Sequence, residues 1–289
     1  MYPSRFHYEA PRSLDEAFGV LQAYGDEAKI LAGGQSLIPL IKLRFAAPAC
    51  IVDINNIPGL RYHEEDSDGS LRIGALCRHR DLERSALLRS KYPVMSVVAP
   101  LISDPMVRNR GTLVGSLCHA DPQGDWASTM LALGGEVIAR NADGGERAIP
   151  VSQFVIGPFQ NTLQVGEIAV GARVPAPRGN RSGTYLKLER RVGDFATVGV
   201  AINLETSGGT INRAGIALTG VGPNNIQCTA AEQSLAGKTL NASTIEQAAR
   251  LAAEAAQPKS DVRGSAEYKR HVVYTFVLRG LSNREAMAA

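Results

Sequence analysis

Near the start of the chain, apolar positions first recur at helical spacing and then gather in short runs. Ser13-Leu-Asp-Glu16 is a capping box that predicts the start of an amphipathic helix, and Gly25 supplies its end. The apolar runs at 28–31 and 50–54 predict strands, with a helix from about Leu37 between them. This pattern predicts a compact strand–loop–helix–strand unit.

From residue 59 to about 175, short strand-like runs alternate with glycine turns. The runs at 71–75, 136–140 and 168–174 predict strands, and residues 80–89 predict a helix. Residues 104–126 are rich in Gly, Asn, Asp and Arg but have little periodicity. Loops of that length within a compact domain usually have a function, so we expect a functional loop there.

The C-terminal part begins after a stretch rich in proline and glycine. Residues 174–183 predict a linker, because proline and glycine interrupt regular structure. The apolar runs at 184–191, 197–205 and 210–220 are joined by tight connections. They predict a three-stranded antiparallel meander.

Three helix candidates follow these strands. The second is opened by the capping box Ser243-Thr-Ile-Glu246, and the third extends from about residue 265 to 280. Strands followed by helices are typical of an α+β domain. We therefore expect three units, at residues 1–57, 58–177 and 178–289.

Composition and charge narrow the class of protein. The 289 residues are 44% hydrophobic and 20% charged, as is ordinary for globular chains. The formal net charge is +3 without a long Lys/Arg block, which argues against nucleic acid or an anionic membrane as the main partner. No apolar run approaches the roughly 20 residues of a membrane span, and no secretory signal is evident. We expect a cytoplasmic protein.

The four cysteines are Cys50, Cys77, Cys118 and Cys228, and none belongs to a CxxC pair. A zinc or iron–sulfur site within this chain is therefore not expected. Cys118 and the adjacent His119 could be a nucleophile and its base. Neighbouring residues on a strand point to opposite faces, however, so a buried and inert thiol is the favoured interpretation.

The stretch AGGQS, residues 32–36, lies between a predicted strand and a predicted helix. Two glycines let successive backbone N–H groups converge into an anion-binding nest. Ser36 is then either the N-cap of the helix or a hydroxyl donor to a phosphate oxygen. An anion nest and a plain capped turn explain this stretch equally well.

A second candidate site is VRNRGTLVGSLCHADPQGD, residues 107–125, which combines glycines with small hydroxyl residues and two carboxylates, Asp121 and Asp125. Ionised carboxylates could accept hydrogen bonds from ribose or ribityl hydroxyls. They could also be an acid–base pair or metal ligands, although no third ligand stands at a suitable spacing. His119 is a further candidate base.

A third dense patch, RRVGDFA at 190–196, follows Lys187. A solvated charged turn between two strands would explain most of it. Lys187 alternates with two leucines and could point at an anionic or electron-rich ligand.

Four motifs together make the sequence more specific. AGGQSLIPLIKLR, VRNRGTLVGSLCHADPQGDW, LERRVGDFATVGVA and SDVRGSAEYKRHVVYTFVLRGL, in this order and spacing, resemble the FAD-binding medium subunit of molybdenum hydroxylases. That family includes flavin subunits of aerobic carbon monoxide dehydrogenase and of bacterial xanthine- and N-heterocycle-type dehydrogenases. The resemblance covers essentially the whole chain.

The resemblance implies an α+β fold of the molybdenum-hydroxylase and vanillyl-alcohol-oxidase-like type. Two N-terminal subdomains would clasp FAD, and a C-terminal α+β domain, with a three-stranded antiparallel sheet plus a helix bundle, would pack beside them. Val114 replaces a glycine that is usual in the second flavin loop, so an altered flavin position or exposure there is a hypothesis.

The resemblance also implies which residues bind FAD. Backbone amides of the AGGQS stretch would hold the pyrophosphate, and Asp125 would form a hydrogen bond with the cofactor. The full set of expected cofactor-binding residues is Ala32, Gly33, Gly34, Gln35, Ser36, Leu37, Ile102, Thr112, Leu113, Gly115, Ser116, Asp125, Ile168, Ala169 and Lys187.

The activity that the resemblance implies is electron transfer. FAD in this chain would take electrons from [2Fe–2S] clusters of a small partner subunit and pass them to an external acceptor. A large subunit with a molybdopterin-type cofactor would oxidise the substrate, and the assembly would be a dimer of heterotrimers. The alternatives are a stand-alone FAD-dependent oxidoreductase, with His119 or Asp121 as base, and a nucleotide-binding module without redox function.

Overall fold

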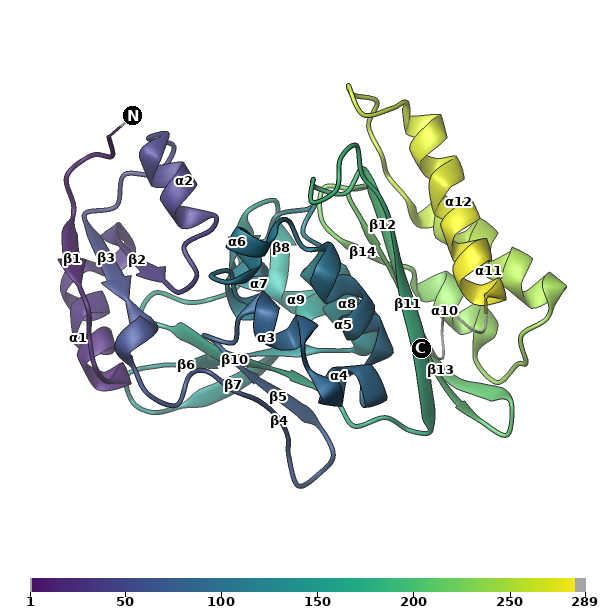
Figure 1. Cartoon of the computed structure of the whole chain (residues 1–289), viewed down its shortest axis with the longest axis horizontal. Helices are drawn as coiled ribbons and strands as arrows, with labels where there is room; N and C mark the ends of the chain where they lie inside the picture. Colours follow the sequence, from purple (N-terminus) through teal and green to yellow (C-terminus); the bar gives the residue numbers. More distant parts are fainter. Residues whose placement is uncertain (1, 284–289) are drawn as a thin grey trace.

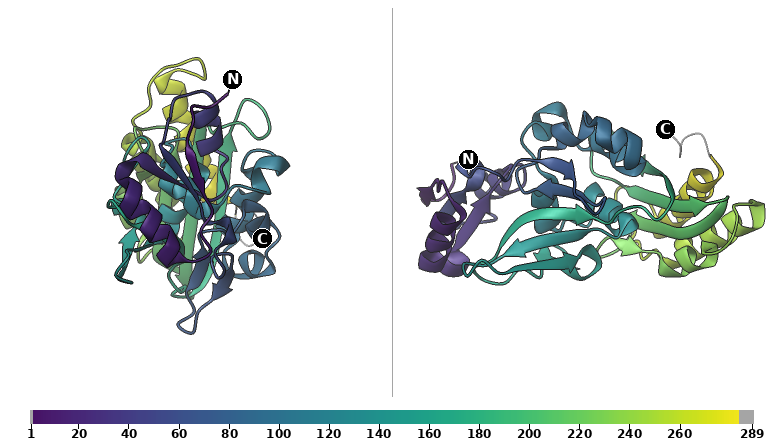
Figure 2. Two further views of the ribbon diagram at one scale, coloured as in Figure 1. Left: turned by 90° about the vertical axis from the view of Figure 1, so that its left-hand side faces the viewer. Right: turned by 90° about the horizontal axis from the view of Figure 1, so that it is seen from below.

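Three main sheets follow one another along an elongated molecule, in the order of the sequence (Figures 1 and 2). The computed structural model describes residues 2–283, so the last six residues of the expected 178–289 unit lie outside the described residues. The N-terminal strands occupy one end, and the C-terminal helices occupy the other. The fold is of the expected α+β class.

The N-terminal sheet is parallel, with strand order β1-β3-β2. The predicted first helix is confirmed, because Ser13 Oγ accepts a hydrogen bond from Glu16 N at 3.1 Å and Gly25 ends the helix with a φ of 53°. This helix buries Ala17, Phe18 and Leu21 in the core. The elements of this unit are β1 (His7–Glu9), α1 (Leu14–Tyr24), β2 (Ala28–Leu31), α2 (Leu37–Lys42) and β3 (Cys50–Asp53).

The middle sheet is antiparallel, with strand order β4-β5-β10-β6-β7, and helices cover one of its faces. The predicted strands near residues 71, 136 and 168 are confirmed as β5, β6 and β10. The strands are β4 (His63–Glu65), β5 (Leu71–Gly74), β6 (Glu136–Arg140), β7 (Glu146–Pro150) and β10 (Ile168–Val174). A separate hairpin consists of β8 (Val155–Gly157) and β9 (Gln160–Asn161).

Short capped helices replace two features that the sequence pattern predicted. The prediction of a single helix at 80–89 is wrong, because Ser85 Oγ accepts a hydrogen bond from Leu88 N and begins a second helix. The prediction of a loop at 104–126 is also wrong, because Asp104 and Thr112 each cap a helix within that segment. The helices of the middle unit are α3 (His79–Glu83), α4 (Ala86–Lys91), α5 (Pro93–Val98), α6 (Pro105–Arg108), α7 (Leu113–His119), α8 (Asp125–Leu133) and α9 (Val151–Phe154).

The C-terminal sheet is antiparallel, with strand order β11-β12-β13-β14. The predicted meander is confirmed, but the sheet has a fourth strand, which at two residues is too short to give a periodic signal. The linker is shorter than predicted, because β10 includes Val174 and β11 begins at Asn180. The strands are β11 (Asn180–Leu188), β12 (Val198–Ser207), β13 (Thr210–Thr219) and β14 (Ile226–Gln227).

This last sheet lies between two layers of helices (Figure 1). One face packs against α5 and α8 of the middle unit, and a Cβ on Gly215 would stand only 1.8 Å from the carbonyl oxygen of Ala132 at the end of α8. The other face is covered by α10 (Thr229–Leu235), α11 (Ala242–Ala255) and α12 (Ala266–Ser282). The predicted cap at Ser243 is wrong, since α11 begins earlier, with Asn241 and Thr244 as its capping box.

The hydrophobic core has two parts. One is continuous from α1 through the middle unit to Tyr185, Ala201 and Ala217 of the last sheet. The other fills the space between that sheet and helices α10–α12. Among the described residues, no helix is both long and apolar enough to cross a bilayer. The C-terminal unit is thus joined to the middle unit by packed apolar side chains as well as by the chain.

Candidate functional site

A cavity of about 670 Å³ lies between the N-terminal unit, the middle unit and the edge of the C-terminal sheet. Its size is in the range of small-molecule and cofactor sites. The lining begins at Leu21 on α1 and reaches Phe195 in the loop between β11 and β12. Every residue expected to bind the cofactor lines this cavity except Leu113, which is fully buried.

The two positions of the AGGQS stretch that hold glycine require it for different structural reasons. Gly34 adopts a φ of +76°, the left-handed region that favours glycine. A Cβ on Gly33 would lie 2.4 Å from the carbonyl oxygen of Arg110 and 2.7 Å from Gly111 Cα. Gly33 therefore allows the first loop to touch the chain that leads into α7.

The same loop presents unused donors to the cavity. Within the described residues, the backbone N–H groups of residues 33–37 donate no hydrogen bond. Ser36 makes no side-chain capping bond to α2, so its hydroxyl is not an N-cap. The Gln35 side chain donates to Gly33 O at 3.1 Å and braces the turn. Free N–H groups and a free hydroxyl on a loop that lines the cavity make a site that suits an anion such as a pyrophosphate.

Arg78 ties the two glycine-containing loops together. Its Nη1 donates to Arg110 O at 2.5 Å, and its Nη2 donates to the side-chain oxygen of Asn55. Asn55 Nδ2 in turn donates to Ala32 O at 2.8 Å. One guanidinium therefore fixes the separation of the first loop from the second.

The start of α7 forms a neighbouring wall. Thr112 Oγ1 accepts a hydrogen bond from Gly115 N at 3.0 Å, and a Cβ on Gly115 would lie only 2.7 Å from that oxygen. Val114 lines the cavity but is only 2% exposed, because its side chain belongs to the central core. The branched side chain at 114 is thus packed among apolar neighbours.

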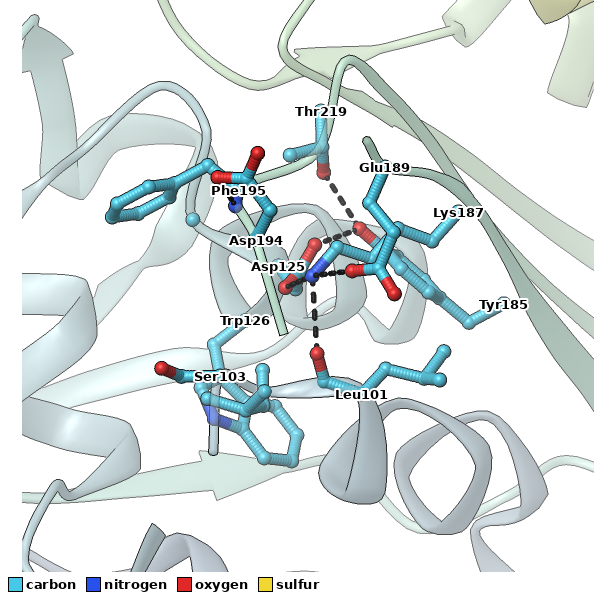
Figure 3. A network of polar contacts seen from close by, with 12 residues as sticks. Leu101, Ser103, Asp125, Trp126, Tyr185, Lys187, Glu189, Asp194, Phe195 and Thr219 are labelled. Atoms are coloured by element: carbon cyan, nitrogen blue, oxygen red, sulfur yellow. Dashed lines mark hydrogen bonds and ion pairs between the residues drawn. The ribbon is translucent and has the colours of Figure 1, made fainter. Parts of the chain in front are cut away.

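A buried polar network that includes Asp125 and Lys187 forms another part of the lining (Figure 3). Lys187 Nζ lies 2.9 Å from Asp125 Oδ2 and donates to Leu101 O at 3.0 Å, and Tyr185 OH donates to Asp125 Oδ1 at 2.6 Å. Burial raises the pKa of Asp125, while the Lys187 cation opposes that shift. Both oxygens of Asp125 already accept a hydrogen bond, so its contact with a ligand would share those lone pairs.

A pair of buried aromatic rings also lies beside the cavity. Trp126 Nε1 donates to His79 Nδ1 at 3.0 Å. Burial lowers the pKa of His79 to about 3, so the imidazole is neutral and its remaining proton is on Nε2. His79 lines the cavity and was not singled out from the sequence, in which a lone histidine gives no signal.

The residues considered as nucleophile or base for a stand-alone reaction are poorly suited to those roles. Cys118 and His119 lie on α7, where the expectation of a strand is wrong, and burial raises the pKa of the Cys118 thiol to about 12. Burial also lowers the pKa of His119, whose ring packs against Phe159 at 5.1 Å between centroids. Asp121 accepts a hydrogen bond from Gln123 N and shapes the turn before α8.

Other parts of the lining were also missed by sequence reasoning. The segment at 161–167, which leads from β9 to β10, contributes to the lining, and Gly193, Asp194 and the half-exposed Phe195 lie at the mouth. The latter belong to the RRVGDFA patch, most of which the sequence interpretation explains as a solvated charged turn. No spacing rule relates these loops to the cavity, because tertiary packing alone brings them there.

Two family models match consecutive parts of the chain. Residues 4–177 match the model of the FAD binding domain in molybdopterin dehydrogenase, and residues 183–283 match the CO dehydrogenase flavoprotein C-terminal domain. The chain belongs to the FAD-binding medium subunits of the molybdenum hydroxylases. It is therefore an oxidoreductase component with an FAD-binding domain.

Similar medium subunits align over nearly their whole length. The carbon monoxide dehydrogenase medium chain of Hydrogenophaga pseudoflava is 37% identical over 289 residues, with all of both chains covered. Subunit alpha of the 6-hydroxypseudooxynicotine dehydrogenase complex of Paenarthrobacter nicotinovorans is 38% identical, covering 98% of this chain and 95% of the relative.

Solved structures confirm the fold of this family member. Carbon monoxide dehydrogenase from Hydrogenophaga pseudoflava, lacking the Mo-pyranopterin moiety of its molybdenum cofactor, superimposes with a TM-score of 0.94 at 39% identity over all of both chains. Quinoline 2-oxidoreductase from Pseudomonas putida 86 gives a TM-score of 0.88 at 33% identity, covering 98% of this chain and 97% of that one.

Proposed function

We propose that this medium subunit carries FAD in the cavity and transfers electrons within a molybdenum hydroxylase complex. Electrons would come from [2Fe–2S] clusters of a small partner subunit and leave to an external acceptor. When bound, FAD supplies the ability to take electrons singly and release them in pairs. The chain's own residues bind and orient the cofactor.

The cavity suggests how FAD would be held. The free N–H groups of residues 33–37 and the Ser36 hydroxyl would bind the pyrophosphate. Gly115 and Ser116 would line the adjoining stretch, and Lys187 with Asp125 would lie toward the flavin end. Ile102, Ile168 and Ala169 would supply apolar wall. Leu113 would support the site from the core.

The observation that carries this proposal is the junction of Gly33 with Arg110 and Gly111. It brings the first anion-binding loop against the second glycine-containing loop, so that both face one cavity of cofactor size. A plain capped turn needs neither the contact nor the unused N–H groups. The raised pKa of the partly buried Cys118 thiol also disfavours a stand-alone reaction at this site.

Further parts of the proposal concern assembly. We expect an iron–sulfur small subunit and a molybdenum large subunit as partners, in a dimer of heterotrimers. We place the domains at 1–57, 58–177 and 178–289, in keeping with family matches that end at 177 and begin at 183. A cytoplasmic location accords with Cys50, Cys77, Cys118 and Cys228 all being free thiols.

The decisive experiment is co-purification of the tagged chain from its native cells. A complex that contains molybdenum and iron–sulfur subunits, together with flavin absorbance near 450 nm, would support the proposal. The chain purified alone should bind FAD and leave it oxidised when candidate substrates are added. Reduction of that flavin by a substrate would indicate a stand-alone oxidoreductase, and failure to bind FAD would contradict the proposal.

A further inference from the structure

The loop between β11 and β12 forms part of the cavity mouth. Gly193, Asp194 and Phe195 line the cavity, and Phe195 is 51% exposed. Gly193 has a φ of +85°, and a Cβ there would lie 2.9 Å from Ser103 O. The loop thus passes close to the middle unit with an aromatic ring at its outer end, without being buried in a core.

An arginine from outside this loop, Arg263, holds it from the C-terminal part of the chain. Arg263 Nη1 donates to Phe195 O at 2.8 Å, and Arg263 Nη2 donates to Asp194 Oδ1 at 3.4 Å. The same Asp194 oxygen accepts a hydrogen bond from Phe195 N at 2.8 Å, and Arg190 approaches the other oxygen at 3.3 Å. The backbone carbonyl of one mouth residue and the carboxylate of the other therefore share one guanidinium.

Arg263 is itself fixed by the start of the last helix. Its backbone N–H donates to Asp261 Oδ1 at 2.8 Å, within a turn that Gly264 closes with a φ of +150°. Lys269 on α12 lies 2.7 Å from Asp261 Oδ2 and also donates to Lys259 O. A series of contacts therefore links α12 to the cavity mouth through Lys269, Asp261 and Arg263.

This turn contributes little to the packed interior. Val262 at its tip is 94% exposed, and no residue of the turn belongs to either hydrophobic core. The side chain of Arg263, by contrast, is only 15% exposed, and its guanidinium donates to polar atoms of the mouth loop. Loss of those contacts would free the loop without removing apolar packing.

We propose that Arg263 is a positioning residue that holds Asp194 and Phe195 at the cavity mouth and thereby limits solvent access to bound cofactor. The inference rests on the proposed function only for the identity of the cofactor. Arg263 does not itself line the cavity, and its contacts there are with Asp194 and Phe195, so its effect is transmitted through the mouth loop. Arginine suits this role better than lysine. Its planar guanidinium can donate to a carbonyl and a carboxylate at different positions, whereas lysine has a single ammonium group.

The test compares three variants of the full chain, with and without added FAD. Arg263→Ala removes both contacts, Arg263→Lys retains one donor, and Arg250→Ala breaks an exposed ion pair with Glu246 on α11 as the control. Hydrogen–deuterium exchange of residues 190–196 reports on the loop without cofactor. Quenching of flavin fluorescence by iodide reports on solvent access in the loaded protein.

In Arg263→Ala, exchange at 190–196 should become about tenfold faster, as expected for loss of one charge-assisted hydrogen bond. The iodide quenching constant should rise, with Arg263→Lys intermediate and Arg250→Ala equal to the native chain. Unchanged exchange and quenching in Arg263→Ala, with native melting behaviour, would overturn the inference. If the native chain takes up no FAD, the proposed function fails, whereas the exchange measurement still decides whether Arg263 holds the loop.

Discussion

At the residue scale, the absence of a side chain matters as much as any functional group. Gly33 brings two loops into contact, whereas Gly34 turns the backbone, although the sequence presents them as one motif. The sequence alone could suggest an anion nest there. It could not show the contact with Arg110, because that depends on how two distant segments pack.

Replacing Gly33 by alanine tests that contact. The added Cβ would lie 2.4 Å from Arg110 O, so the loops must separate. We expect a loss of about 1–3 kcal/mol in the free energy of unfolding and a lower FAD content. Urea unfolding and the ratio of flavin to protein absorbance measure both effects.

Gly19→Ala is the matched control, because nothing lies within 4 Å of a Cβ at that position in α1. It should stabilise the chain by about 0.5–1 kcal/mol and leave FAD content unchanged. Equal behaviour of the two variants would contradict the role given to Gly33.

Lys187→Met tests the buried ion pair. It leaves Asp125 without its cation, and the pKa of Asp125, already raised by burial, should rise further. A carboxyl with a raised pKa in the folded state binds more protons than in the unfolded state, so stability falls as pH rises toward the folded pKa. We expect a loss of about 3–5 kcal/mol at pH 8 and a smaller loss at pH 5, by urea unfolding without FAD.

The double variant Lys187→Met with Asp125→Asn is the control for this prediction. The neutral amide removes the uncompensated charge of Asp125, so the part of the pH dependence that comes from Asp125 should disappear. Glu189, which lies 3.4 Å from Lys187 Nζ, keeps its carboxylate in both variants. A destabilisation of Lys187→Met that is the same at both pH values would indicate lost packing instead of an unpaired carboxylate.

At the scale of secondary structure elements, long periodic segments could be predicted, whereas helices of four to six residues could not. Strands β10 to β13 and helix α1 carry long apolar patterns, and the structure confirms them. Helices α3, α4 and α6 have four to six residues each, so their caps define them and periodicity does not. The C-terminal sheet faces helices on both sides, and its face toward α5 and α8 contains the buried amide of Asn203.

Asn203 offers a test of that face. Neither its side-chain nitrogen nor its oxygen has a hydrogen-bond partner within the described residues, and its neighbours across the sheet are Gly183 and Gly215. Burying an amide without partners is unfavourable, and valine suits a strand. We expect Asn203→Val to raise the free energy of unfolding by about 1 kcal/mol, measured by urea unfolding.

Asn203→Asp has nearly the same shape but adds a buried charge, so it should be strongly destabilising at neutral pH. A substantial loss of stability in Asn203→Val would instead indicate that a buried water satisfies the amide.

At the scale of the whole molecule, the cavity is a joint product of all three units. Its lining includes Leu21 of α1, Gly115 of α7 and Lys187 of β11. Local patterns could identify the loops that bind an anion and the strands that support them. They could not place Phe195 or the loop at 161–167 beside those loops, because these belong to different units or lack periodicity.

Separating the C-terminal unit should therefore abolish cofactor retention. A fragment of residues 1–177 lacks Lys187 and the mouth loop and exposes the faces of α5 and α8 that the last sheet covers. We expect it to lose FAD on gel filtration and to aggregate. Co-expression with residues 178–289 should restore at least part of the binding.

A chain interrupted in the exposed turn between β6 and β7, at residues 143–144, is the matched control. That turn does not line the cavity, so FAD should be retained after gel filtration. Retention by the 1–177 fragment alone would show that the third unit is dispensable for binding.

The spread of the cavity lining along the chain also bears on biosynthesis. A ribosome adds about 5–20 residues per second, so the anion nest emerges well before Lys187 and before strand β12, which pairs with β11. A nascent chain would have an incomplete binding site throughout most of its translation. Cofactor would then enter a finished polypeptide by mass action, and the cellular supply of free FAD would set the fraction of subunits that become active.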